Sequence, residues 1–193
     1  AVRFGRRGAV DGLRCASCRL PTIWRHSHNL NQKLVELLSV LKIQHTEFSP
    51  NVDEHWLCDT LAEVVQELGL GPEDARITLD FDYEFNGFYD EQLIGIAVHN
   101  ALINAMKAGA RQISIQVEEH DDGSFTILVM DDGPGFPEKL LDLTEFKSHG
   151  TSGGLGLYLM DQALQAHGHN SHKGTIKLSN RPQGGACVAL EVP

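Results

Sequence analysis

Amide and ammonium side chains recur at helical spacing in one segment of the sequence, at Asn100, Asn104 and Lys107. Positions i, i+4 and i+7 fall on one face of a helix. Asparagine is a poor residue for a helix interior, because its side chain competes for backbone hydrogen bonds. An amide oxygen can ligate a hard cation such as Mg²⁺, and an ammonium group can neutralise phosphate oxygens. The pattern allows a site for a metal and phosphate, although by itself it is more typical of an exposed polar face.

An acidic glycine turn at residues 131–135 (DDGPG) follows an apolar strand that we predict over residues 125–130. The strand would deliver Asp131 to the end of a sheet, and Gly133 and Gly135 let the backbone approach a planar ligand closely. A carboxylate there could accept a hydrogen bond from an exocyclic amine such as that of adenine. The alternative interpretation is a plain Asp-Gly turn that binds no ligand.

A second glycine-rich turn, at residues 150–157 (GTSGGLGL), precedes a predicted helix. Glycines at a helix start, here Gly154 and Gly156 on either side of Leu155, leave backbone N–H groups free for phosphate, which the helix dipole also attracts. The segment lacks the Gly-Lys-Ser/Thr end of a P-loop and follows no βαβ unit, so it matches neither of those two phosphate motifs. The order and spacing of the three segments together favour a nucleotide pocket, which no one of them would indicate alone.

Periodic apolar residues predict the elements that position these segments. Helices are predicted over residues 23–46, 54–68, 91–108 and 155–166. Strands are predicted over residues 75–85, 112–118, 125–130, 175–179 and 186–192. The third helix has an apolar stripe made of Ile94, Val98, Ala101, Ala105 and Ala108. Because antiparallel hairpins outnumber βαβ units, we expect a two-layer α/β sandwich, with one mixed, largely antiparallel sheet under a layer of helices.

The composition is that of a globular protein with an uneven charge. The 193 residues, 41% of them hydrophobic, fit one domain with an appendage or two small domains. The net charge is −10, although residues 1–25 hold six Arg and one Asp. The acidic remainder argues against nonspecific binding to nucleic acid. No run of 18 apolar residues occurs, so we predict no membrane segment.

The N-terminal residues 1–22 show no periodicity and are predicted to form a flexible basic leader. Within it, Cys15 and Cys18 form a CxxC pair, but no second pair of cysteines or histidines completes a zinc site at the usual spacing. The remaining cysteines suit a reducing compartment, which predicts a cytoplasmic location.

The three segments together resemble the motifs of the ATP-binding fold that gyrase, histidine kinases and MutL share. The stretch NALINAMKAGA resembles the N box of that superfamily, VMDDGPGF its first glycine box and GTSGGLGLYLM its second. The closing stretches GTIKLSN and GGACVALEVP are similar to the last strands of the histidine-kinase ATP domain. The resemblance covers residues 48–193 and implies a two-layer sandwich of the Bergerat type over that range.

The resemblance also implies the ligands of the nucleotide. Asn104 would ligate Mg²⁺, with Asn100 and Lys107 near the phosphates, and Asp131 would bind adenine. The pocket would be shaped by Gly133 and Gly135, and the phosphates would meet Gly154, Leu155 and Gly156. Residues 136–152 would form a lid over ATP, with Phe146 as a possible anchor and Lys147 within reach of phosphate. Gyrase-like ATPases have a glutamate general base at the position of Asn100, and an amide cannot take a proton from water, so transfer to another nucleophile is favoured over hydrolysis.

The predicted helix within residues 23–47 resembles half of the hairpin through which histidine kinases dimerise. His28, and after it His26, are the candidate phosphoryl acceptors, because a neutral imidazole is a good nucleophile near pH 7. The hypothesis is therefore the catalytic domain of a sensor histidine kinase, with a response-regulator receiver domain as partner and a homodimer through this helix. The alternatives are a serine kinase similar to anti-sigma factors and a nucleotide-binding module without catalysis.

Overall fold

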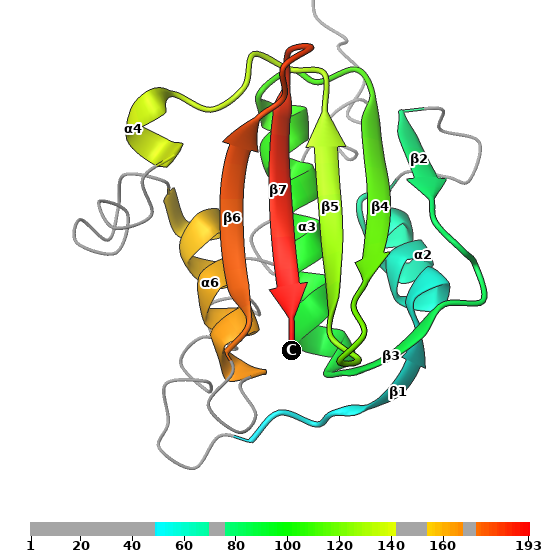
Figure 1. Cartoon of the computed structure of the whole chain (residues 1–193). Coiled ribbons are helices and arrows are strands. Elements are labelled where there is room, and N and C mark those ends of the chain that lie inside the picture. Colours follow the sequence, from blue (N-terminus) through cyan, green and yellow to red (C-terminus); the bar gives the residue numbers. More distant parts are fainter. Residues whose placement is uncertain (1–48, 70–75, 142–153, 168–172) are drawn as a thin grey trace, which may run out of the picture. The chain divides into compact units, whose positions relative to one another are not determined.

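The computed structural model describes residues 49–69, 76–141, 154–167 and 173–193 (Figure 1). The chain divides into two compact units, residues 1–38 and 39–193, and every described residue belongs to the second. The predicted leader and N-terminal helix, with His26, His28, Cys15 and Cys18, lie outside the described residues. The architecture given below is that of the second unit.

A five-stranded sheet forms one layer of this unit, in the order β2-β4-β5-β7-β6 (Figure 1). Its strands are β2 (Ile77–Asp80), β4 (Ile113–Glu119), β5 (Phe125–Asp131), β6 (Thr175–Asn180) and β7 (Ala186–Val192). Strand β2 is parallel to β4, and all other neighbours in the sheet are antiparallel. The expected mixed, largely antiparallel sheet is confirmed.

Helices form the second layer of the unit. They are α2 (Leu57–Glu67), α3 (Glu91–Lys107) and α6 (Gly154–Ala166). The single turn α4 (Glu138–Leu141) follows β5 and buries none of its residues. Alternate residues of the strands point toward α3, since side chains on a strand alternate between its two faces. The resulting core includes Ile115, Ile127, Val129 and Leu190 from the sheet, each at most 2% exposed. The two-layer α/β sandwich expected from the sequence is confirmed.

Helix α3 begins and ends as the sequence predicts. Asp90 caps its start, because a carboxylate oxygen of Asp90 accepts a hydrogen bond from the backbone N–H of Leu93 at 3.1 Å. After its end Gly109 adopts a φ of 89°, a left-handed conformation that glycine reaches without strain. Ala108, which we placed in the apolar stripe, is instead exposed, since it is the C-cap residue of the helix.

Two predictions between residues 53 and 89 are wrong. The predicted helix over 54–68 begins only at Leu57, because Asp53–Trp56 form strand β1, which pairs in antiparallel fashion with β3 (Asn86–Tyr89). Trp56 is therefore 48% exposed on this small second sheet rather than buried on a helix face. The strand predicted over 75–85 is confined to β2, and β3 follows it as a strand that the sequence analysis missed. In the described ranges, no helix has both the length and the apolar character that a membrane crossing requires.

Candidate functional site

The C-terminal half of α3 holds the two asparagines. Asn100 is only 6% exposed, and its side-chain Nδ2 donates a hydrogen bond to the backbone oxygen of Ile96 at 2.9 Å. Asn104, one turn later, is half-buried, and Lys107 is exposed in the last turn. The burial of Asn100 contradicts the interpretation of this face as an ordinary exposed polar surface, since buried amides in proteins carry specific hydrogen bonds.

The first turn of α6 lies against these two asparagines. A Cβ atom on Gly156 would be 3.1 Å from Oδ1 of Asn100 and 3.4 Å from the amide atoms of Asn104. The missing side chain of Gly156 is therefore what leaves room beside both amides. Gly154 and Leu155 are the first two residues of the helix, which begins one residue earlier than the sequence predicts. The first N–H groups of a helix have no partners within it, and such groups can bind an anion.

Asp131 ends strand β5 and is 6% exposed. Its Oδ1 accepts two backbone hydrogen bonds, from the N–H of Gly133 at 2.7 Å and from that of Ala186 at 3.2 Å. Among the described residues, no hydrogen bond ends on the other oxygen, Oδ2. The backbone on either side of Asp131 thus fixes its carboxylate through one oxygen, Oδ1.

Both glycines of the first glycine turn are sites of close approach. A Cβ on Gly133 would be 2.9 Å from Oδ1 of Asp131 and 3.8 Å from the Cβ atoms of Ala108 and Ala110. Gly135 has a φ of 80°, and a Cβ there would be 2.7 Å from Oδ1 of Asn180. Gly133 therefore lies beside the end of α3, while Gly156 lies beside its preceding turns. Helix α3 thus contacts the described parts of both glycine-rich segments.

Asp132 also holds this end of the molecule together. Its Oδ1 accepts backbone hydrogen bonds from Gln112 at 3.0 Å and from Arg111 at 2.7 Å, and these two bonds lower the pKa of the Asp132 carboxyl. The sequence alone indicates no role for Asp132. Asp132 joins the glycine turn to the segment between α3 and β4. The adjacent carboxylates of Asp131 and Asp132 therefore bind different parts of the backbone.

The residues that sequence reasoning missed come from the hairpin between β6 and β7. Ala186 donates to Asp131, while Asn180 and Arg181 contact the glycine turn from across the sheet. Figure 1 shows this hairpin turn at the same end of the sheet as the chain that leaves β5. The adjacent Gly184 and Gly185 were the available signal, because paired glycines in a turn indicate close approach of another backbone.

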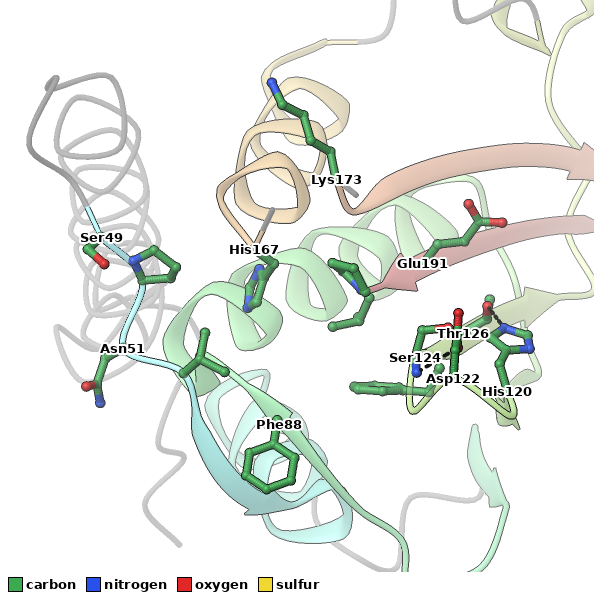
Figure 2. Close-up of a pocket in the computed structure, with 15 residues that line it drawn as sticks. Ser49, Asn51, Phe88, His120, Asp122, Ser124, Thr126, His167, Lys173 and Glu191 are labelled. Carbon is green, nitrogen blue, oxygen red and sulfur yellow. Dashed lines mark hydrogen bonds between the residues drawn. The ribbon is translucent and has the colours of Figure 1, made fainter. Parts of the chain in front are cut away.

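A large cavity of about 1130 Å³ lies at the opposite end of the sheet (Figure 2). It is lined by Phe125 and Val192, which begin β5 and end β7, whereas Asp131 ends β5. Six residues of strand separate these ends by roughly 20 Å. Figure 2 shows His120 and Thr126 joined by a hydrogen bond on one side of the cavity. This cavity is therefore distinct from the candidate nucleotide site.

The predicted lid is described only as far as Leu141, so Phe146 and Lys147 lie outside the described residues. In the part of the chain that the structure describes, no group of three His, Cys, Asp or Glu side chains could hold a metal. Among the described residues at the candidate site, Asn100 and Asn104 offer amide oxygens, to which a bound nucleotide would add oxygens of its own. That donor set suits Mg²⁺, which commonly combines one or two protein ligands with phosphates and water.

Residues 89–193 match the family model for histidine kinase-, DNA gyrase B- and HSP90-like ATPases. The sensor protein KdpD of Escherichia coli (strain K12) is 31% identical over 186 residues, which cover 89% of this chain and 20% of that protein. The sensor-like histidine kinase SenX3 of Mycolicibacterium smegmatis is 25% identical over 181 residues, 86% of this chain and 45% of that protein. The chain thus spans less than half the length of these relatives.

Solved structures show the same fold. The ATP-binding domain of PrrB from Mycobacterium tuberculosis aligns with a TM-score of 0.59 and 26% identity, covering 74% of this chain and 97% of that one. The histidine kinase AdeS of Acinetobacter baumannii aligns with a TM-score of 0.69 and 16% identity, covering 93% of this chain and 86% of that one. The second likeness, at its low identity, speaks to the fold alone.

Proposed function

Because the chain belongs to the family of histidine kinase-, DNA gyrase B- and HSP90-like ATPases, we propose that it is the ATP-binding catalytic domain of a sensor histidine kinase. In this proposal it binds Mg-ATP and transfers the γ-phosphoryl group to a histidine, from which the group passes to an aspartate of a response-regulator receiver domain. The relatives named as sensor histidine kinases support this choice within the family. A cytoplasmic location belongs to the same proposal.

The observation that carries the proposal is the held carboxylate of Asp131. Two backbone N–H groups bind its Oδ1, and in this proposal Oδ2 accepts from the ligand. A buried, oriented acceptor of this kind selects a ligand that offers a donor such as the exocyclic amine of adenine, because a ligand without that donor leaves the buried oxygen unpaired. A side chain on the neighbouring Gly133 would crowd this carboxylate, because its Cβ would be 2.9 Å from Oδ1 of Asp131.

The phosphate end of the nucleotide would lie between α3 and the first turn of α6. Asn104 is the proposed Mg²⁺ ligand, and its amide lies beside Gly156 with no side chain between them. Bound Mg²⁺ would neutralise charge on the phosphate oxygens. Lys107 is proposed to add positive charge near the phosphates, and the N–H groups at Gly154, Leu155 and Gly156 to bind phosphate oxygens.

The side chain of Asn100 favours phosphoryl transfer over hydrolysis. An amide has no basic site, and Nδ2 of Asn100 already donates to the backbone of its own helix. No general base for an attacking water is supplied at this position, which disfavours hydrolysis and favours transfer to another nucleophile. We propose His28, with His26 as the second candidate, on a helix at 23–47 through which two copies of the protein would associate.

The first experiment measures ATP affinity by calorimetry. In the Asp131→Asn variant the amide oxygen can still accept both backbone hydrogen bonds, whereas an amide N–H then faces the adenine amine. A lost charge-assisted hydrogen bond corresponds to an affinity loss of about tenfold to a hundredfold. Asp132→Asn is the matched control, since the same chemical change falls one residue away on a carboxylate bound to other backbone groups. Equal ATP affinity for wild type and Asp131→Asn would contradict the adenine assignment.

The second experiment identifies the acceptor with γ-labelled ATP. Label that is labile in acid and stable in base indicates phosphohistidine, and its loss in His28→Gln but not in His26→Gln assigns the acceptor. Acid-stable label would instead indicate a serine kinase. ATP binding without any label, either on this chain or on an added receiver domain, would indicate a nucleotide-binding module that does not catalyse transfer.

A further inference from the structure

The hairpin between β6 and β7 contacts the first glycine turn (residues 131–135) at Phe136, the residue that follows the turn. Asn180, the last residue of β6, binds both backbone polar groups of Phe136. Its Oδ1 accepts from the N–H of Phe136 at 2.6 Å, and its Nδ2 donates to the oxygen of the same residue at 2.9 Å. One side chain thus pairs with Phe136 as a neighbouring strand would. The backbone that leaves the glycine turn is fixed at this point.

The same hairpin holds the near end of the turn. Nη1 of Arg181 donates to the backbone oxygen of Asp131 at 3.1 Å, and the N–H of Ala186 donates to its carboxylate. Gly185 packs so closely that a Cβ on it would be 1.8 Å from that backbone oxygen. Asp131 is therefore held by its main chain and its side chain together, by residues that follow it by 50 or more positions.

Between these two ends the turn is held at Asp132, by hydrogen bonds with the backbone of Arg111 and Gln112, and by the bond from Gly133 to Asp131. It contains Gly133 and Gly135, and glycine loses more conformational freedom on ordering than any other residue. A ligand that had to order the turn would bind less tightly by that entropic cost, whereas a turn already held in shape avoids it. The side chain of Asn180 is exposed and that of Arg181 is half-buried, so neither is a core residue whose main role is packing.

We propose that Asn180 and Arg181 are positioning residues for the nucleotide pocket, which keep the first glycine turn in the shape that presents Asp131 to its ligand. This inference rests on the proposed function, because it assumes that Asp131 binds adenine. It assigns a binding role to two side chains outside all three nucleotide-binding segments. Neither side chain needs to touch the nucleotide.

The test measures ATP and GTP affinity by calorimetry for wild type, Asn180→Ala, Arg181→Ala and the control Gln183→Ala. Gln183 is an exposed residue of the same turn, so its replacement controls for general effects on the hairpin. We expect each of the first two variants to bind ATP about three- to tenfold more weakly, the effect of one net hydrogen bond on an equilibrium constant. The control should stay within twofold of wild type, and the preference for ATP over GTP should shrink only in the first two variants.

A double-mutant cycle separates positioning from direct contact. In an Asp131→Asn background, Asn180→Ala and Arg181→Ala should lose most of their effect on ATP affinity, because they act through Asp131. If Arg181 instead bound phosphate directly, its effect would persist undiminished in that background, and this result would overturn the positioning role. Thermal unfolding of each variant shows whether it is folded.

A conservative variant keeps the proposal open to refutation even where alanine disturbs folding. Asn180→Asp keeps the acceptor for the N–H of Phe136 and loses the donor to its oxygen, so its ATP affinity should fall between wild type and Asn180→Ala. Wild-type affinity and selectivity in both Asn180 variants would refute the inference while leaving the proposed function intact. A wild-type protein that binds no adenine nucleotide would overturn both.

Discussion

Replacing Gly156 by alanine separates the binding role of a glycine from its conformational role. The φ of Gly156 is not among the positive values found in the described residues, so alanine fits its backbone. The added Cβ would meet only the ends of two side chains, at 3.1 Å from Oδ1 of Asn100 and 3.4 Å from the amide of Asn104. The contact with Asn100 is short by a few tenths of an ångström and that with Asn104 is at the limit of ordinary contact, so that small rotations of the two amide side chains can relieve them.

The expected effect on stability is small and the expected effect on binding is large. Alanine in place of glycine within a helix contributes up to about 1 kcal/mol to the free energy of unfolding, and the crowding of the two amides offsets part of this gain. Rotated amides, however, no longer present their oxygens to the cation and phosphates. If one charge-assisted interaction is lost, about 1.5–3 kcal/mol of binding free energy goes with it, roughly a tenfold or greater weakening for Mg-ATP.

Urea unfolding and calorimetric titration with Mg-ATP test both parts. Gly95→Ala is the matched control, because Gly95 lies inside α3 and a Cβ there would be 3.7 Å from the nearest atom, Cγ2 of Val64. This control should gain stability and bind Mg-ATP as wild type does. A folded Gly156→Ala variant with wild-type affinity would refute the reasoning that places the phosphates beside Asn100 and Asn104.

Two predictions concern the opposite end of α3. Asp90→Ala removes the acceptor for the backbone N–H groups of Leu93 and Asn51 and should lower the free energy of unfolding by about 1–2 kcal/mol in urea titrations, with the exposed Asp121→Ala as an unaffected control. Burial lowers the pKa of the His167 imidazole, whose Nε2 accepts from the N–H of Asp90 at 3.0 Å. The unfolded chain therefore binds a proton on this imidazole more readily than the folded chain does. The stability that the neutral His167 contributes is fully present above about pH 6.5 and is lost as the pH falls below it. Wild type should therefore lose more stability than His167→Gln between about pH 7.5 and pH 5.5, and equal losses would contradict a buried neutral His167.

The elements that the sequence predicts correctly are those with local causes. Helix α3 is capped by Asp90, one residue before its start, and is followed by Gly109, two residues after its end. The hairpin between β4 and β5 follows from the Asp-Gly signal at 121–124, where Gly123 adopts a φ of 85° and Ser124 closes the turn by accepting from the N–H of His120 at 3.0 Å. Each of these interactions spans only a few residues, so the sequence alone could indicate it.

The features that the sequence analysis missed have distant causes. Asp53–Trp56 is a strand because Asn86–Tyr89, about 33 positions further along the chain, pairs with it. Trp56, at the end of this strand, fits the apolar period of the helix that follows, so the sequence pattern placed it in that helix. In the same way, nothing near Asn180 in the sequence reveals that it pairs with Phe136, 44 residues earlier. A motif shows which residues approach a ligand, but the residues that hold the motif in place come from wherever the fold brings another chain segment beside it.

The glycines at this end of the molecule differ in what a side chain on each would meet, and the sequence motifs do not show this difference. A Cβ on Gly185 would overlap the backbone of Asp131 at 1.8 Å, whereas a Cβ on Gly156 would meet only the ends of movable side chains at 3.1 Å. Backbone cannot move aside without disturbing the sheet, so Gly185 is required by the fold. Movable amides can yield, so the fold tolerates a side chain at position 156. Under the proposed function, what favours glycine there is the space beside Asn100 and Asn104, in which the phosphates would bind.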